Sequence, residues 1–213
     1  MGPHILTDVK ASTGVPAFKE WAVIVDALLE GEQIIDVRKG GIHEDGRHFG
    51  IESTRFWLYP TYLHQQADLL KPAYRGAIEH TLATAPPDDV VRLPGWADVV
   101  GVAQLTEPDH LAAIDSKFIW TLDYAATRLK WKRRDPLWVL ALRVHRLETP
   151  IEVPVREEYG GCTSWVEIVD DLGDPADLDG ASSTPALSDE AFEARLNFLA
   201  NDLAVPLQPP TVA

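Results

Sequence analysis

Residues 34–66 read IIDVRKGGIHEDGRHFGIESTRFWLYPTYLHQQ, and the rest of the chain is organised around this stretch. Residues 33–39 contain Ile34, Ile35 and Val37 and predict a strand, which a double glycine ends. A polar turn signal follows, and residues 49–59 are rich in β-forming side chains up to Pro60. The stretch therefore predicts a strand, a turn and a second strand.

The preceding segment, residues 18–29, is a dense apolar run, FKEWAVIVDALL. Such a run fits either a helix or a buried strand, because periodicity does not separate the two. A short turn signal containing Gly31 joins this run to the strand at residues 33–39. Two apolar segments joined by a short glycine-containing turn favour a β-hairpin, so we expect a strand over residues 21–29.

Apolar spacing farther along the chain predicts more strands and helices. Residues 137–147, LWVLALRVHRL, are the strongest strand candidate, and their continuous apolar character indicates burial on both faces. Further helices are expected at residues 68–85, 110–115 and 118–129, and further strands at residues 90–105, 151–155 and 164–169. Glycines are expected to divide residues 90–105 into one or two short strands. This order predicts an α+β fold with a largely antiparallel or mixed central sheet, flanking helices and a C-terminal amphipathic helix.

The sequence predicts one α+β domain over residues 17–169, followed by two further segments. Residues 170–187 are acidic and rich in glycine, proline and serine, which is typical of a flexible linker. Residues 188–204 begin with the capping residue Ser188 and carry apolar side chains at helical spacing, so they predict the C-terminal helix.

The composition limits the class of protein. Of the 213 residues, 46% are hydrophobic, which is ordinary for a chain that buries a core. No apolar run reaches the ~18 residues of a membrane-spanning helix, and no signal pattern opens the chain, so a cytoplasmic protein is expected. The single cysteine excludes an internal disulfide and a multi-cysteine metal site, and no motif predicts a cofactor or a metal ion.

The net charge of −14 is distributed unevenly. Residues 165–213 hold ten acidic residues and one basic residue, for a net charge of −9, which leaves 18 basic and 23 acidic residues, or −5, in residues 1–164. A protein that binds nucleic acid over its whole surface is normally basic. The total charge therefore argues against such a protein, whereas a local basic surface remains open.

Several separated motifs agree with one family. They are Lys19-Glu20-Trp21-Ala22, Arg38-Lys39-Gly40-Gly41-Ile42, Tyr59-Pro60-Thr61-Tyr62 with His64-Gln65, Leu142-Arg143-Val144, and the YGGCTSW segment at residues 159–165. With these motifs, residues 18–170 resemble the bacterial domain-of-unknown-function family 1802. The resemblance transfers no activity and no catalytic residue. Some related chains are associated with a restriction-endonuclease-type domain, which implies a role in restriction–modification.

The first candidate site is the glycine turn after residues 33–39. Arg38 and Lys39 supply positive charge, and Gly40 and Gly41 permit a concave backbone whose N–H groups bind an anion. The alternative is a strand that ends in a glycine bulge.

The second candidate site follows the strand at residues 49–59. Tyr59 and Tyr62 offer faces on which a nucleobase stacks, Gln65 is able to read a base edge, and His64 is a candidate catalytic acid–base. The alternative is that the tyrosines are packed in the core and His64 caps the next helix.

The third candidate site is the basic run KWKRR: Lys130, Trp131, Lys132, Arg133 and Arg134. A tryptophan among cations is typical of surfaces that bind phosphates and bases. The alternative is a solvated helix end whose cations suit the helix dipole. A looser pattern, Asp98 with Asp115-Ser116-Lys117, matches the spacing of metal-dependent nucleases.

These observations predict a ligand site between residues 38–41, residues 59–65 and the strand carrying Arg143 and His145. The leading functional hypothesis is a non-catalytic nucleic-acid-binding module in restriction or defence. In this hypothesis the acidic segment covers the basic run and competes with the phosphates of the nucleic acid until it is displaced. One alternative is an enzyme that uses His64 as acid–base with Arg38 or Arg143 as anion clamp. The other is a structural module that forms a homo-oligomer through its C-terminal helix.

Overall fold

The computed structural model describes residues 14–39, 50–130, 135–161, 163–169, 172 and 182–212. Within them the chain forms one seven-stranded mixed sheet in the order β2-β5-β4-β3-β1-β6, with β7 also paired to β5. The strands are β1 (Val15–Trp21), β2 (Ile35–Arg38), β3 (Arg55–Thr61), β4 (Val90–Leu105), β5 (Leu137–Pro154), β6 (Trp165–Ile168) and β7 (Ser183–Pro185). Since β1 pairs parallel to β3 and the other pairs are antiparallel, the predicted α+β class with a mixed sheet is confirmed.

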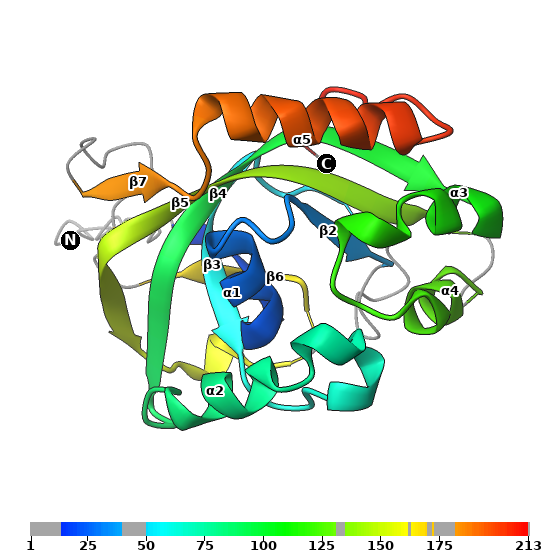
Figure 1. Cartoon of the computed structure of the whole chain (residues 1–213). Helices are drawn as coiled ribbons and strands as arrows, with labels where there is room; N and C mark the ends of the chain where they lie inside the picture. The colour runs from blue at the N-terminus through cyan, green and yellow to red at the C-terminus, as the bar shows by residue number, and fades with distance from the viewer. Residues whose placement is uncertain are drawn as a thin grey trace, which may run out of the picture.

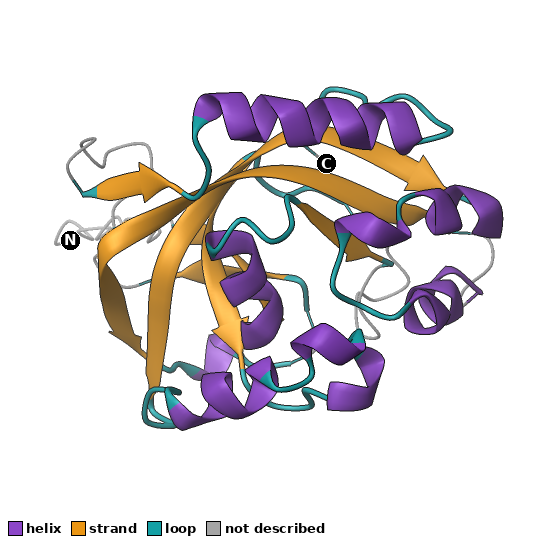
Figure 2. Ribbon diagram, in the orientation of Figure 1, coloured by secondary structure: helices purple, strands orange, loops and turns teal. Residues whose placement is uncertain are grey.

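Helices cover this sheet on both sides (Figures 1 and 2). The α-helices are α1 (Ala22–Leu29), α2 (Ala77–Ala83), α3 (Pro108–Ala113), α4 (Leu122–Lys130) and α5 (Asp189–Asp202). Short 3-10 turns are η1 (Ala67–Leu69), η2 (Pro72–Tyr74), η3 (Asp115–Lys117) and η4 (Glu157–Tyr159). In Figure 1, α5 runs across β4 and β5 on the side opposite to α1. Among the described residues, no helix is long and apolar enough to cross a membrane.

The strand expected over residues 21–29 is wrong, because these residues form α1 after β1 ends at Trp21. Seven of the eight α1 residues are buried, so the helix shows no polar face that would have revealed it. Gly31, at a φ of 69°, ends α1 in the left-handed conformation that glycine adopts without strain. No hairpin forms between residues 21–29 and 33–39, and β2 pairs with β5 instead.

Strands β4 and β5 are longer than expected, at 16 and 18 residues. They pair along most of their length, with register shifts between Leu93 and Gly95 and between Val99 and Gly101. The two glycines therefore mark irregularities within one long strand, where one or two short strands were expected. At Gly95 a Cβ atom would lie 2.3 Å from the carbonyl oxygen of His145, so only glycine fits there.

The burial of β5 on two faces is confirmed. Leu137 and residues 139–142 have no exposed surface. Strand β3 also departs from expectation, because Pro60 lies inside it, opposite Glu20 of β1. The β4 pairing covers only residues 55–57 of β3, so Pro60 interrupts no ladder on that side.

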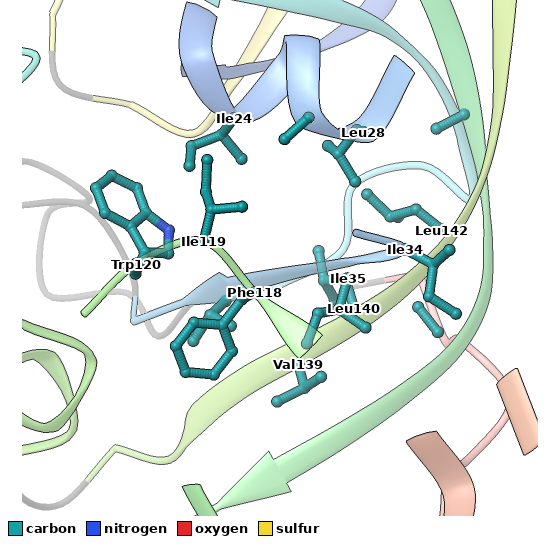
Figure 3. Close-up of a cluster of buried hydrophobic side chains, with 14 of the residues drawn as sticks. Ile24, Leu28, Ile34, Ile35, Phe118, Ile119, Trp120, Val139, Leu140 and Leu142 are labelled. Atoms are coloured by element: carbon teal, nitrogen blue, oxygen red, sulfur yellow. The ribbon is translucent and has the colours of Figure 1, made fainter. Parts of the chain in front are cut away.

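The main core lies between α1, the sheet and the segment before α4. Figure 3 shows side chains from α1, β2, β5 and residues 118–120 gathered in one cluster. The helix predicted over residues 118–129 begins only at Leu122, because Phe118 is extended and Trp120 bridges to Leu70. A second cluster, around Trp57 and Tyr159, covers another part of the sheet.

The C-terminal helix belongs to the main core. Phe192 and Leu199 of α5 and the following Leu203 are 5%, 0% and 7% exposed. Ser188 is the N-cap, as predicted, since its Oγ accepts a hydrogen bond of 3.2 Å from the N–H of Ala191. Because α5 supplies buried side chains, it contributes to the stability of the sheet on which it lies.

Candidate functional site

The curvature of the sheet brings β2, at one end of the strand order, back against β1. The link is Arg38 of β2, whose Nη2 donates to the backbone carbonyl of Lys19. The guanidinium also lies over the ring of Phe18, at 4.5 Å from its centroid. Arg38 therefore holds the two strands together in addition to carrying charge.

Arg38 is shared by two buried carboxylates. Its Nη2 lies 3.0 Å from Oε2 of Glu20, and its Nε lies 3.0 Å from Oδ2 of Asp36. Glu20 is 4% exposed and Asp36 is 1% exposed. Neither oxygen of Asp36 has a hydrogen-bond donor among the described residues, although buried polar atoms normally have one. We call Glu20, Asp36 and Arg38 the acid–arginine cluster.

The acid–arginine cluster holds more negative than positive charge in a buried place. Burial, with a contribution from the carboxylate of Asp36, raises the pKa of Glu20 to about 7. Arg38, Arg128 and the N–H of Trp21 oppose this rise. The N–H of Trp21 donates to Glu20 Oε1 at 2.6 Å, so this carboxylate lies at the start of α1. Glu20 consequently exchanges a proton close to neutral pH.

Beside this cluster, Lys39 joins three parts of the chain. Its Nζ donates to the carbonyl of Leu129, at 2.7 Å, and to the carbonyl of Asp135. These residues flank the basic run, and Lys39 itself is followed by the double glycine. Burial lowers the pKa of Lys39, and Asp135 opposes this change. We call Lys39, Leu129 and Asp135 the Lys39 junction.

Two of the predicted sites therefore begin at one place. The Lys39 junction anchors residue 39, before Gly40 and Gly41, and both flanks of the basic run. Gly40, Gly41, Trp131, Lys132, Arg133 and Arg134 lie outside the described residues. Lys130 ends α4 and is exposed.

Aromatic rings lie between the start of α1 and α4. Trp120 contacts Trp21 at 4.7 Å and Tyr124 at 4.8 Å between ring centroids. The guanidinium of Arg128 lies 5.7 Å from the centroid of Tyr124. Trp21, Tyr124 and Arg128 are partly exposed, and Nε1 of Trp120 has no acceptor among the described residues. Such an arrangement offers a stacking surface together with a cation.

Tyr59 and Gln65 make structural contacts. Tyr59 is 8% exposed and meets Tyr159 edge-on, at 6.2 Å between centroids. Burial, with a contribution from Tyr159, raises the pKa of Tyr59 to about 12. Gln65 accepts a hydrogen bond of 3.0 Å from the N–H of Val23 and donates to Oγ1 of Thr81 at 3.3 Å. Gln65 therefore caps α1 and ties it to α2.

Tyr62 and His64 lie in the loop between these contacts. His64 is exposed and has a φ of 65°, a left-handed conformation that is uncommon for residues other than glycine. Tyr62 is partly exposed, and burial followed by the charge of Asp26 raises its pKa. The hydroxyl of Thr61 donates to the carbonyl of Glu20 at 3.0 Å. The loop and Arg38 thus both contact the junction between β1 and α1.

Arg143 and His145 lie elsewhere on the sheet. Trp138 is the partner of Arg38 in the β2–β5 register, and Arg143 is five residues farther along β5, or about 17 Å at the usual rise. Arg143 contacts Asp189 at 2.5 Å and lies over the ring of Phe192. The ring of His145 stacks on Trp96 at 3.9 Å. Burial lowers the pKa of His145, and the carboxylate of Asp98 opposes this shift.

The nuclease-like pattern is not assembled. Asp98 binds Arg55 through two hydrogen bonds of 2.6 and 2.8 Å. Asp115 belongs to η3 and pairs with Lys71. The described part of the chain contains no group of three or more His, Cys, Asp or Glu side chains placed to hold a metal ion.

The sequence analysis did not single out Glu20, Asp36, Trp120 or Tyr124 as site residues. The position of Glu20 could have been predicted from the sequence. Glu20 is two residues after Phe18, so in a strand the two side chains lie on the same face. That prediction depends on recognising that β1 ends at Trp21. No local pattern indicates Trp120, whose neighbours come from distant segments.

No curated protein matches the sequence. Three solved structures of the ASCH protein from Zymomonas mobilis are similar to this chain. A serine-to-alanine mutant is 13% identical, with 87% of this chain and 96% of that chain covered and a TM-score of 0.38. A tyrosine-to-phenylalanine mutant is 12% identical (85% and 96% covered, TM-score 0.37), and the protein without substitution is 13% identical (85% and 93% covered, TM-score 0.36).

The family comparison covers most of the chain. It extends past the motifs at residues 18–170 and includes the first part of α5. The family model described as Domain of unknown function (DUF1802) matches residues 17–197, and the chain therefore belongs to the DUF1802 family.

Proposed function

We propose that this protein is a non-catalytic module that binds single-stranded nucleic acid at the surface around the Lys39 junction. The observation that carries the proposal is the pair of bonds from Lys39 Nζ to the carbonyls of Leu129 and Asp135. These bonds fix both flanks of the KWKRR run beside the RKGG segment. The cations of this run would supply the positive charge that a phosphate backbone requires.

The side chains next to the junction suit a single strand. Tyr124 and Arg128 of α4 are partly exposed, and Lys130 is exposed. Stacking of one base on an aromatic side chain contributes about 1–3 kcal/mol, and it tolerates any base sequence. Together with Trp131, Lys132, Arg133 and Arg134, these residues would combine phosphate contacts with stacking.

The contacts of Arg38 and Arg143 favour a binding role over an enzyme that uses His64 as acid–base. Arg38 lies between Glu20 and Asp36 and donates to a backbone carbonyl. Arg143 pairs with Asp189. Each arginine already has a carboxylate partner, so neither offers a free anion clamp to a substrate beside His64.

The proposal is tested by the fluorescence anisotropy of labelled single-stranded RNA, single-stranded DNA and duplex DNA at two salt concentrations. The double variant Arg133→Gln/Arg134→Gln should bind single strands more weakly. The slope of log affinity against log salt should fall in magnitude by about 1 to 2, because two phosphate contacts are lost.

The matched control is the double variant Arg92→Gln/Arg146→Gln. Both control arginines are partly or fully exposed, pair with surface glutamates, and lie on β4 and β5. The control removes the same charge and should leave the salt slope near that of the wild type. Equal weakening by both double variants, or no binding at low salt, would contradict the proposal.

The role in restriction–modification or defence is a further part of the proposal. It rests on the association of related chains with a restriction-endonuclease-type domain. A phage-plating assay in a host with and without the gene, repeated with Arg133→Gln/Arg134→Gln, measures it. Protection by the wild type that the double variant loses would support the role, and equal plating in all three strains would contradict it.

A further inference from the structure

A groove of about 440 Å³ lies between β4, β5 and the segment after α5. Its strand side includes Gln104 of β4 and Trp138 of β5, which are opposite each other in the register. Its other side includes Pro206, Gln208 and Pro209. The volume is within the range of about 300–1,000 Å³ that is usual for small-ligand sites.

The wall formed by the C-terminal segment is fixed to the sheet. The N–H of Gln208 donates to the carbonyl of Val102 at 2.7 Å, and the N–H of Val102 donates to the carbonyl of Gln208 at 2.9 Å. Next to this bridge, Leu207 approaches Gly101 so closely that an added Cβ atom would lie 3.4 Å from it. These contacts fix the position of this wall of the groove.

The described residues that line the groove carry no formal charge. They combine one partly exposed indole, that of Trp138, with the exposed side-chain amides of Gln104 and Gln208. An amide is both a donor and an acceptor of hydrogen bonds, and an indole offers a flat apolar face. This chemistry fits an uncharged planar ring with donors and acceptors on its edge better than it fits a phosphate.

The groove lies beside the surface proposed for the phosphate backbone. Trp138 is three residues after Asp135, which Lys39 holds, and it is opposite Arg38 in the β2–β5 register. Three residues span at most about 11 Å. A nucleic-acid strand whose phosphates contact the basic run therefore has a base within reach of the groove.

We propose that the groove is a nucleobase subsite, in which one base stacks on Trp138 and its edge bonds to Gln104 or Gln208. This inference rests on the proposed function, because the basic run must bind the nucleic acid for a base to reach the groove. It adds an amide that reads a base edge, whereas the phosphate contacts and stacking of the basic run tolerate any base sequence. Asn and Gln amides are common partners of adenine edges, so adenine is the base expected to bind best.

The test compares a single-stranded oligoadenylate with the same oligonucleotide made abasic, using wild type and two variants. Trp138→Leu keeps an apolar side chain but loses the stacking face, and should weaken oligoadenylate binding by about 5- to 150-fold. Trp138→Phe keeps an aromatic face and should restore most of the affinity. All three proteins should bind the abasic strand with the same lower affinity.

Controls separate the subsite from the fold and from the phosphate surface. Gln66→Ala changes an exposed glutamine outside the groove and should have no effect. If Trp138→Leu fails to fold, Gln104→Ala/Gln208→Ala provides the same comparison with two exposed side chains. Unchanged oligoadenylate affinity in Trp138→Leu overturns the subsite and leaves the proposed function intact. No binding of either strand overturns both.

Discussion

At the scale of single residues, Glu20 makes the stability of the protein depend on pH. Its pKa is raised from 4.5 to about 7 in the folded state, so the native protein holds this proton more tightly than the unfolded chain does. The stability that the raised pKa of Glu20 contributes is therefore fully present below pH 4.5 and is lost as the pH rises through 7. Between pH 5 and pH 8, Glu20 should cost on the order of 1–3 kcal/mol of unfolding free energy.

The free energy of unfolding of the wild type and of Glu20→Gln is measured in urea at pH 5 and pH 8, with tryptophan fluorescence as the signal. The glutamine keeps an oxygen for the N–H of Trp21 and does not titrate. The wild type should lose stability relative to the variant as the pH rises. Parallel pH profiles would show that Glu20 is not the titrating group.

Prediction from sequence is weakest at this scale. Arg38 was recognised from its sequence neighbours, but its pairing with Glu20 and Asp36 depends on the return of β2 against β1. Gln65 is predicted to read a base edge, and its side chain also accepts the N–H of Val23. A polar residue next to a candidate loop serves equally well as a helix cap, and only the positions of distant segments decide between the two roles.

At the scale of secondary-structure elements, Gly95 is required for the pairing of β4 with β5. Gly95→Ala should be strongly destabilising, by roughly 2–4 kcal/mol, because the new methyl group would meet the His145 carbonyl at 2.3 Å and Leu29 at 2.8 Å. Thermal and urea unfolding measure the loss. Gly76→Ala is the control, since nothing lies within 4 Å of its added Cβ atom, and similar losses in both variants would contradict the steric explanation.

The two faces of α5 give a second prediction for an element. Leu199 has no exposed surface, and Leu199→Ala should cost about 2–5 kcal/mol through lost burial and the cavity left behind. The adjacent Phe198 is 62% exposed, and Phe198→Ala should change stability by less than about 1 kcal/mol. Chemical denaturation compares the two variants. An equal cost at both positions would contradict the packing of α5 against the sheet.

Elements with a strong one-sided pattern or a long apolar run were predictable. The β5 strand and the C-terminal helix, with Ser188 as its cap, follow directly from the sequence. Helix α1 does not, because its surroundings are apolar on nearly every side and leave no periodic pattern. Its short length of eight residues also overlaps the usual length of a strand.

At the scale of the whole molecule, we expect the acidic segment to compete with nucleic acid for the basic run. Replacing five aspartates by asparagine should increase single-strand affinity several-fold, most strongly at low salt where charges are least screened. The five are Asp170, Asp171, Asp174, Asp177 and Asp179, which lie outside the described residues. Deleting residues 170–213 would not test this, because the deletion removes the buried side chains of α5.

The control neutralises five exposed acids elsewhere. They are Glu79, Asp88, Glu148, Glu157 and Glu158. Anisotropy titrations of both proteins separate local competition from the general effect of net charge. Equal gains in affinity would show that only net charge matters.

Self-association through α5 is a further prediction for the whole molecule. Phe198 places a large exposed ring on the outer face of this helix, with Lys117 at 5.6 Å from its centroid. If this face joins two copies, sedimentation velocity should show a mass that rises with concentration, and Phe198→Glu should remove the rise. A constant monomer mass for the wild type would exclude the dimer.

The register shift beside Gly95 also determines which face of the sheet each side chain of β4 lies on. Leu93 and Trp96 belong to the same core cluster although their positions differ by three, so the inward–outward alternation of β4 changes phase between them. Ala97 and Val99 consequently face the main core. With strict alternation over the same residues, Trp96, Ala97 and Val99 would each turn to the opposite face. The number of residues between these two side chains is therefore as constrained as their identity.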